Sequence, residues 1–170
     1  MVSSLLGRDA ELRIADAVLF GRANGVTFAG PHGAGKSALL DAIALRALEL
    51  GVTMHRVHGT PALSEVSFGA ATHLLSDDGT EQRQHMIRMT ERRLAASGGS
   101  GGTTLIVDDA QDLDMATLGL LHAVAVGRRV HLAIAVADLA SAPVSLTRLW
   151  KDAHLDRHEL APLTRARAER

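Results

Sequence analysis

Short apolar runs recur along this chain and are separated by longer segments in which strong helix formers predominate. Short apolar runs are typical of strands that are buried on both faces of a parallel sheet. We expect strands at residues 26–29, 52–57, 104–107 and 131–137, with a weaker one at 155–160. We expect helices up to about residue 20 and at residues 37–50, 78–96, 114–125 and 145–151.

The alternation of these elements predicts an α/β fold with a central parallel sheet of about five strands and helices on both faces. No internal repeat and no convincing interdomain linker interrupts the pattern, so we expect one domain over residues 1–170. The segment Ser97–Gly102 consists of Ser and Gly alone. That composition is typical of a flexible surface loop or a linker.

The composition indicates a globular protein, since hydrophobic residues make up 46% and charged residues 22% of the chain. A net charge of −1 gives no bulk attraction to nucleic acid or to an anionic membrane. The absence of cysteine excludes disulfides and thiolate metal sites. No signal peptide and no apolar run of transmembrane length is present, so we expect a cytoplasmic protein that binds neither a membrane nor, directly, nucleic acid.

A glycine-rich motif follows the first expected strand. The segment Gly30–Ser37 (GPHGAGKS) matches the phosphate-binding pattern G-x-x-x-x-G-K-S. Glycine lets consecutive backbone N–H groups turn toward phosphate oxygens, Lys36 would reach the terminal phosphates, and the Ser37 hydroxyl would bind Mg²⁺. The expected nucleotide-binding residues of this loop are Gly30, His32, Gly33, Ala34, Gly35, Lys36, Ser37 and Ala38.

A chance match within a Gly-rich turn is the alternative for this motif. The order of strand, glycine loop and helix argues against it, because that order places a helix N-terminus against the phosphates. Together with the α/β alternation, the motif predicts a three-layer P-loop NTPase of the RecA/AAA-like type.

A pair of carboxylates follows the third expected strand, where Leu105–Val107 leads into Asp108 and Asp109. Ligands bind at the carboxyl ends of parallel strands. We expect Asp108 to hold Mg²⁺ through a water molecule, and Asp109 to orient the attacking water. Lys36 and Asp109 are thus the expected catalytic residues. The alternative is that the two aspartates only cap the helix that follows them.

Four segments of the chain resemble one family of ATPases. Leu5–Leu12 resembles the "hhGRxxEL" box that precedes the P-loop in many AAA-type and signal-transduction ATPases. Val107–Asp114 resembles the "VDDAQxLD" stretch of the large ATP-binding LuxR-family regulators, a branch of the STAND ATPases. Ser64–Gly69 is similar to a segment with Glu and Phe after their second strand, and Leu160–Thr164 to the junction with their next helical subdomain.

The resemblance implies an ATP-driven switch with ATP or ADP and Mg²⁺ as ligands. It places the opening box near the adenine, so Leu6, Gly7 and Arg8 are expected to contact the base or the ribose. For Arg8, a solvated charge at the start of a helix is the alternative. Regulatory and DNA-binding domains outside this chain are the implied partners, with a homo-oligomer as a further option.

The same resemblance divides the chain into three parts: an adenine-side box and helix (residues 1–22), a core (residues 23–164) and the beginning of a following segment (residues 165–170). Asp138 departs from the family pattern, because related ATPases often have a polar or arginine residue there that senses the γ-phosphate.

Slow hydrolysis is expected, since Asp109 is shorter than the glutamate of many ATPases and no arginine is evident near the γ-phosphate. Arg128 and Arg129 could act on a neighbouring subunit, although exposed basic residues at a helix C-terminus are more common. The nine histidines give no zinc-site pattern. For example, His154 and His158 would share a face only on a helix.

Two other functions fit the P-loop less well. A small-molecule kinase would carry an arginine-rich lid, and none is found between Gly127 and Ala161. A non-catalytic interaction domain with a degenerate site is opposed by the intact Lys36, Ser37 and Asp108.

Overall fold

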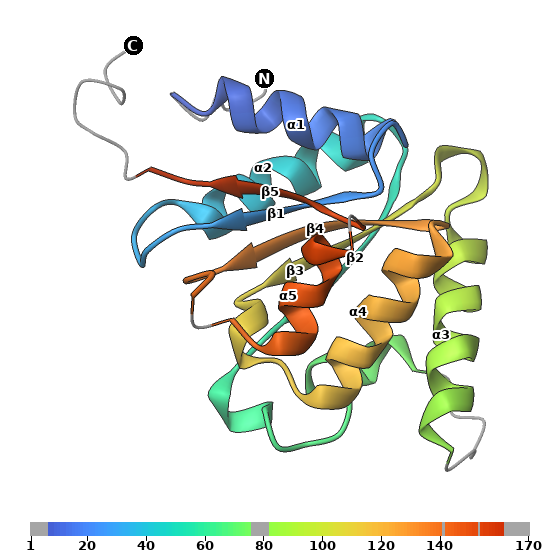
Figure 1. Cartoon of the computed structure of the whole chain (residues 1–170). Coiled ribbons are helices and arrows are strands. Elements are labelled where there is room, and N and C mark those ends of the chain that lie inside the picture. Colours follow the sequence, from blue (N-terminus) through green and yellow to red (C-terminus); the bar gives the residue numbers. More distant parts are fainter. Residues whose placement is uncertain (1–6, 76–81, 141, 153, 162–170) are drawn as a thin grey trace.

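The computed structural model describes residues 7–75, 82–140, 142–152 and 154–161. Five strands form one sheet in the order β2-β3-β4-β1-β5, and every neighbouring pair is parallel. Figure 1 shows this sheet at the centre of the molecule with helices on both sides. The expected α/β fold with a parallel sheet of about five strands is therefore confirmed.

The strands are β1 (Gly25–Ala29), β2 (Thr53–His58), β3 (Thr103–Asp108), β4 (Val130–Val136) and β5 (Asp156–Glu159). The α-helices are α1 (Asp9–Leu19), α2 (Lys36–Glu49), α3 (Arg83–Ser97), α4 (Met115–Gly127) and α5 (Val144–Lys151). These bounds agree closely with the expected ranges. The expected start of the third helix, at residues 78–81, lies outside the described residues.

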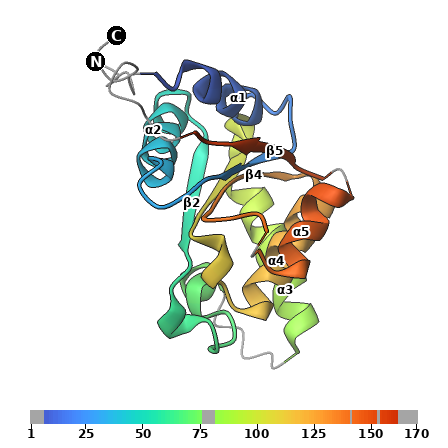
Figure 2. The same cartoon turned by 60° about the vertical axis from the view of Figure 1, so that its left-hand side comes forward.

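Successive side chains of the central strands enter two separate hydrophobic cores. Leu105 and Val107 of β3 belong to a core that they share with α3, α4 and α5, whereas Ile106 between them joins a second core with α1 and α2. Figure 2 shows α1 and α2 on one side of the sheet and the other three helices on the opposite side. Both faces of the sheet are covered, so β1 and β3 are buried at every position, which explains the apolar runs in the sequence.

The Ser- and Gly-only segment, Ser97–Gly102, forms a compact turn between α3 and β3. A Cβ atom at Gly98 would lie 2.2 Å from the carbonyl carbon of Gly102, and one at Gly101 would lie 2.4 Å from the carbonyl oxygen of Gly51. Close backbone packing therefore requires glycine at these two positions. The segment is thus a surface turn, one of the two expected alternatives, and its composition reflects this packing.

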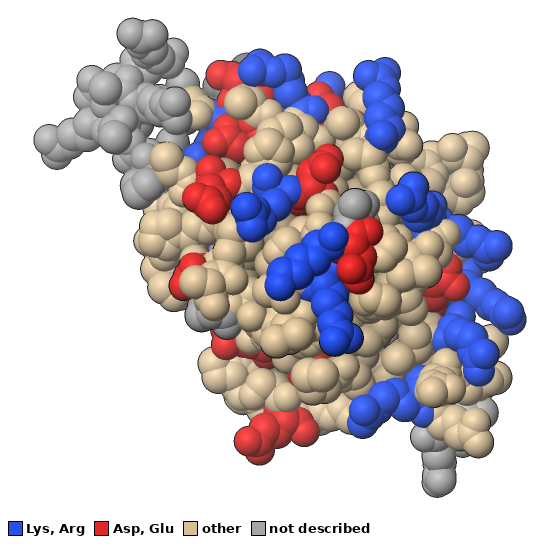
Figure 3. All heavy atoms as spheres, viewed as in Figure 1, with Lys and Arg blue, Asp and Glu red and all other residues tan. Residues whose placement is uncertain are grey.

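The outer face of α3 carries charged side chains, with Arg83, Arg88 and Arg92 exposed. In Figure 3, Lys and Arg gather along the margin that α3 forms, while Asp and Glu are interspersed over the rest of this face. Within the described part of the chain, no helix has both the length and the apolar character needed to cross a membrane.

Candidate functional site

The carboxyl ends of β1 and β3 lie at the same edge of the sheet. Thr27 of β1, Ile134 of β4 and Val107 of β3 are in register across these three strands. The P-loop leaves β1 after Ala29, and Asp108 ends β3, so both motifs emerge at this edge. With one strand between them, β1 and β3 are about 10 Å apart. Phosphate groups and a hydrated Mg²⁺ would span that distance.

Two glycines turn the P-loop. Gly33 and Gly35 have φ angles of 79° and 83°, in the left-handed region that favours glycine. Space around Gly33 is open, whereas a Cβ atom at Gly30 would lie 2.9 Å from the carbonyl oxygen of Leu160. Gly35 precedes α2, and the first N–H groups of a helix lack intrahelical partners. An open glycine turn on a helix N-terminus fits a phosphate group.

Lys36 is buried, and its ammonium group folds back onto its own loop. The Nζ atom donates to the carbonyl oxygens of Gly30, at 2.7 Å, and Pro31, at 3.0 Å. A bound phosphate would therefore compete with these two carbonyls for the ammonium group. Ser37 and Ala38 follow in the first turn of α2 and are exposed, so the Ser37 hydroxyl is accessible to a ligand.

Asp108 is only 2% exposed and lies beside an arginine. Its Oδ1 accepts a hydrogen bond from the backbone N–H of Asp109 at 3.0 Å, and its Oδ2 lies 3.5 Å from Nη2 of Arg56 on β2. Arg56 also forms an ion pair with Asp41 of α2. The sequence analysis did not single out Arg56, which the pairing of β2 with β3 brings beside Asp108.

Asp109 has a φ of 47°, a left-handed conformation that Asp and Asn adopt more readily than most residues. Gln111 donates to Oδ1 of Asp109 at 3.1 Å and accepts from the backbone N–H of Ala137 at 3.0 Å. A Cβ atom at Gly59, after β2, would lie 2.1 Å from the carbonyl oxygen of Asp109. The backbone of Asp109 thus packs against the segment after β2, and its carboxylate accepts from Gln111, which is bonded to the segment after β4.

The cap of the following helix is Asp114, not the aspartate pair. Asp114 accepts hydrogen bonds from the backbone N–H groups of Ala116 and Thr117 and from the Thr117 hydroxyl. Asp109 makes no side-chain cap bond. The alternative that Asp108 and Asp109 serve only as caps is therefore wrong.

Asp114 also explains the segment that resembles the family's Glu and Phe element. Phe68 is buried, and its backbone N–H donates to Oδ1 of Asp114 at 2.9 Å. Glu65 is exposed. In this segment the side chain of Phe68 belongs to the core. Its backbone N–H links the segment after β2 to Asp114 at the start of α4.

Arg8 is 1% exposed, which shows that the alternative of a solvated charge is wrong. Its Nη2 donates to the carbonyl oxygen of Ala34 in the P-loop and, at 2.8 Å, to that of Ala161. Its Nη1 pairs with Glu11 at 2.9 Å. Arg8 thus joins the start of α1, the P-loop and the segment after β5. Leu6, which the resemblance also places near the base, lies outside the described residues.

Replacing Arg8 with Ala is expected to lower the free energy of unfolding by about 2 kcal/mol, because charge-assisted hydrogen bonds contribute about 1.5–3 kcal/mol each. Arg8→Lys should recover little, since one ammonium group lacks the planar fork that reaches two carbonyls and a carboxylate. Urea denaturation measures both losses. Arg13→Ala, an exposed change on α1, is the matched control, and an equal loss there would contradict the role of Arg8.

A cleft of about 630 Å³ adjoins the P-loop at the ends of β1, β4 and β5. Gly30 and His32 form one wall, and Asp138 and Glu159 are part of the lining. Asp138 accepts a hydrogen bond from the backbone N–H of Ala140 at 2.9 Å. The cleft provides room beside the loop for the part of a ligand that extends beyond its phosphates.

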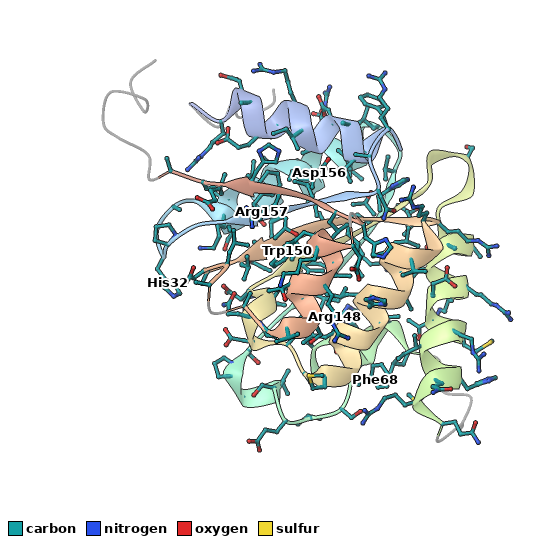
Figure 4. The ribbon with its side chains drawn as sticks, viewed as in Figure 1. His32, Phe68, Arg148, Trp150, Asp156 and Arg157 are labelled. Atoms are coloured by element: carbon teal, nitrogen blue, oxygen red, sulfur yellow. The ribbon has the colours of Figure 1, made fainter. Side chains whose placement is uncertain are left out.

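Of the other residues singled out in the sequence, His32 belongs to the wall of this cleft, whereas two arginines lie apart from it. His32 is exposed and points outward at the P-loop (Figure 4). Arg128 and Arg129 are exposed between α4 and β4, at the opposite edge of the sheet, and their action on a second subunit stays a prediction. The expected junction extends to residues 162–164, which lie outside the described residues.

No protein-family model matches the sequence, and no curated protein matches it. Solved structures do match. Caenorhabditis elegans (C. elegans) PCH-2 has a TM-score of 0.55 and 14% identity, covering 94% of this chain and 44% of that chain. A DNA replication initiation factor has a TM-score of 0.57 and 18% identity, covering 91% of this chain and 47% of that one.

A third match, the structure of Drosophila ORC bound to AT-rich DNA and Cdc6, has a TM-score of 0.57 and 13% identity, covering 91% of this chain and 57% of that chain. This chain therefore spans about half the length of the structures it matches. The likeness shows the fold alone, which is the three-layer α/β fold of the RecA/AAA-like type that the sequence predicts.

Proposed function

We propose that this chain is an ATP-binding nucleotide-switch domain that hydrolyses ATP slowly. The proposal rests on the position of the P-loop and of Asp108 at the same edge of the sheet. A glycine loop with the buried Lys36 opens onto the N-terminus of α2, and the buried Asp108 ends β3 at the same edge. The AAA-type fold supports the proposal, because open α/β sheets generally bind their ligands at this edge.

Each residue then has a defined task. Backbone N–H groups from Gly33 to Ala38 bind the β-phosphate, and Lys36 exchanges its two loop carbonyls for phosphate oxygens. The Ser37 hydroxyl and the Asp108 carboxylate offer the hard oxygen ligands that Mg²⁺ prefers. Mg²⁺ would neutralise charge on the phosphates. Asp109, oriented by Gln111, accepts a hydrogen bond from the attacking water.

The wider proposal concerns the protein to which the domain belongs. We infer that the chain is one domain over residues 1–170 of a cytoplasmic STAND-type transcriptional regulator of the LuxR family. The opening box and the VDDAQDLD stretch support that inference. Nucleotide contacts would bias the arrangement of regulatory and DNA-binding domains that follow it.

Calorimetric titration of the chain with Mg-ATP and Mg-ADP tests nucleotide binding. We expect one site per chain. Competition of a fluorescent ATP analogue by ATP and GTP tests the base, and we expect ATP to compete better because no N-K-x-D-type guanine motif is present. Absence of binding to the folded wild-type chain in the presence of Mg²⁺ would refute the proposed function and favour a non-catalytic interaction domain.

Asp109→Asn is expected to reduce steady-state phosphate release at least tenfold while leaving ATP affinity within about twofold. Asn keeps the size of the side chain and tolerates the left-handed backbone, so the change removes mainly the charge. Gln111 can still bond to the amide oxygen. Phosphate release and calorimetry on the same preparation separate the two effects. Turnover of several per second by the wild type, on the other hand, would contradict the slow switch.

A further inference from the structure

Two histidines and an aspartate from separate parts of the chain converge at the edge of the sheet opposite the P-loop. His122 lies on α4, Asp152 directly follows α5, and His154 precedes β5. Their potential ligand atoms all lie within 4.8 Å of one another. The two imidazole rings meet edge to face, with 6.0 Å between their centroids. We propose that these three side chains bind a divalent transition-metal ion of the Zn²⁺ type.

The backbone that carries these side chains is held in place by hydrogen bonds. The Nδ2 atom of Asn24 donates to the carbonyl oxygens of Ala125 on α4 and of His154, each at 2.8 Å. The backbone N–H of Asp152 donates to the carbonyl oxygen of Arg148, and that of His154 to the carbonyl oxygen of Leu149. One asparagine therefore fixes the helix that bears one histidine against the loop that bears the other.

The three ligand atoms must move closer together to bind a metal ion. Tetrahedral Zn²⁺ with bonds of about 2.0–2.2 Å places its ligand atoms about 3.3 Å apart. In the structure the ligand atoms of the three residues lie within 4.8 Å of one another. Asp152 is exposed and can rotate toward the two rings without disturbing a packed core. A water molecule would complete the fourth position, as at zinc sites with three protein ligands.

A second observation at His154 points to a ligand. Its Nδ1 atom is buried and has no hydrogen-bond partner in the structure. A buried polar atom without a partner is destabilising. Coordination of a metal ion through Nδ1 would satisfy it, and the ring already lies edge to face with that of His122.

The ligand set selects the class of metal. Two imidazoles and one carboxylate favour Zn²⁺, Ni²⁺ or Cu²⁺ over Mg²⁺ and Ca²⁺, which prefer oxygen ligands. The guanidinium-bearing Arg148 lines the same groove as His122, and Figure 4 shows it on α5 beside α4. Mg²⁺ at the P-loop and the proposed metal here are thus chemically separate.

Zinc titration of the metal-free wild-type chain, followed by competition with a chromophoric chelator, measures this site without nucleotide. We expect one tight site per chain. His122→Ala and His154→Ala should each weaken it at least tenfold, and saturating Zn²⁺ should raise the unfolding temperature of the wild type but not of these variants. Co²⁺ in place of Zn²⁺ should give the visible absorption of tetrahedral coordination.

His85→Ala is the matched control, because His85 is exposed on α3, outside the cluster. Asp152→Asn serves as a second variant at an exposed position that should leave the fold intact, which far-ultraviolet circular dichroism checks. The proposal would be overturned if His85→Ala weakened Zn²⁺ binding as much as His122→Ala. It would also be overturned if Asp152→Asn and His122→Ala both left the Zn²⁺ affinity unchanged. Either result would assign binding to scattered surface histidines. Neither result depends on the P-loop, so the proposed nucleotide function is tested separately.

Discussion

Lys36→Ala is expected to weaken Mg-ATP binding at least tenfold. Charge-assisted hydrogen bonds contribute about 1.5–3 kcal/mol each, and about 1.4 kcal/mol corresponds to a factor of ten in affinity. In the present structure the ammonium group bonds to two loop carbonyls, so part of its interaction with phosphate is offset by the loss of those bonds. Calorimetry with Mg-ATP and Mg-ADP measures the change.

Lys151→Ala is the control for this experiment, because Lys151 is the other lysine of the chain and is exposed at the end of α5. Its replacement should leave nucleotide affinity unchanged. Thermal unfolding of both variants establishes that they are folded. Equal affinities for wild type and Lys36→Ala would show that Lys36 does not contact the nucleotide, even if binding itself persists.

Asp114→Ala should reduce the free energy of unfolding by about 3 kcal/mol, combining the loss of a helix cap with an unsatisfied buried N–H group. Phe68 would lose the acceptor of its backbone N–H, which is the bond that fastens the connection after β2 to α4. Asp114→Asn should cost less, since one amide oxygen can still accept. Asp9→Ala, an exposed change in α1 without a side-chain cap bond, should cost less than about 0.5 kcal/mol.

The effect of Asp114 should also depend on pH. Burial alone would raise the pKa of Asp114, but hydrogen bonds from the side chain and backbone of Thr117 and from the N–H groups of Phe68 and Ala116 hold that pKa below its ordinary value. A depressed pKa stabilises the fold above the pKa of the unfolded chain, and this contribution is lost as the pH falls through the folded value.

The difference in stability between wild type and Asp114→Asn should therefore be constant near neutral pH and shrink below about pH 4, the ordinary range of an aspartate pKa. Urea denaturation at a series of pH values measures this difference. A difference that widens on acidification would show that the carboxylate is not stabilised by its hydrogen bonds.

Features of the site that depend on local sequence were predictable. The P-loop and the Asp108–Asp109 pair each follow an apolar strand directly, so their position at the carboxyl edge follows from the parallel topology. Arg56 was not predictable, because its approach to Asp108 depends on β2 pairing with β3 rather than with another strand. The order of strands in a sheet leaves no mark on the spacing of residues along the chain.

Side chains that act across long separations were missed for the same reason. The histidine pairs evident in the sequence are close neighbours along the chain, whereas the structure brings His122 of α4 to His154 near β5. The buried position of Arg8 likewise depends on two carbonyls, of Ala34 and Ala161, that meet only in the folded molecule. Periodicity predicts which face of an element is apolar, but not which distant polar group it meets.

The hydrogen bonds of Arg8 have a thermodynamic consequence. One guanidinium group joins the P-loop at Ala34 to Ala161, the last residue described after β5. A nucleotide that favours one position of Ala34 would then favour one position of the chain that follows Ala161. Linkage is reciprocal, so any ligand or domain that fixes that following segment must change nucleotide affinity by the same factor. The ratio of nucleotide affinities with the segment free and with it fixed would thus give the coupling free energy. By reciprocity, the same free energy describes the effect of nucleotide on the segment.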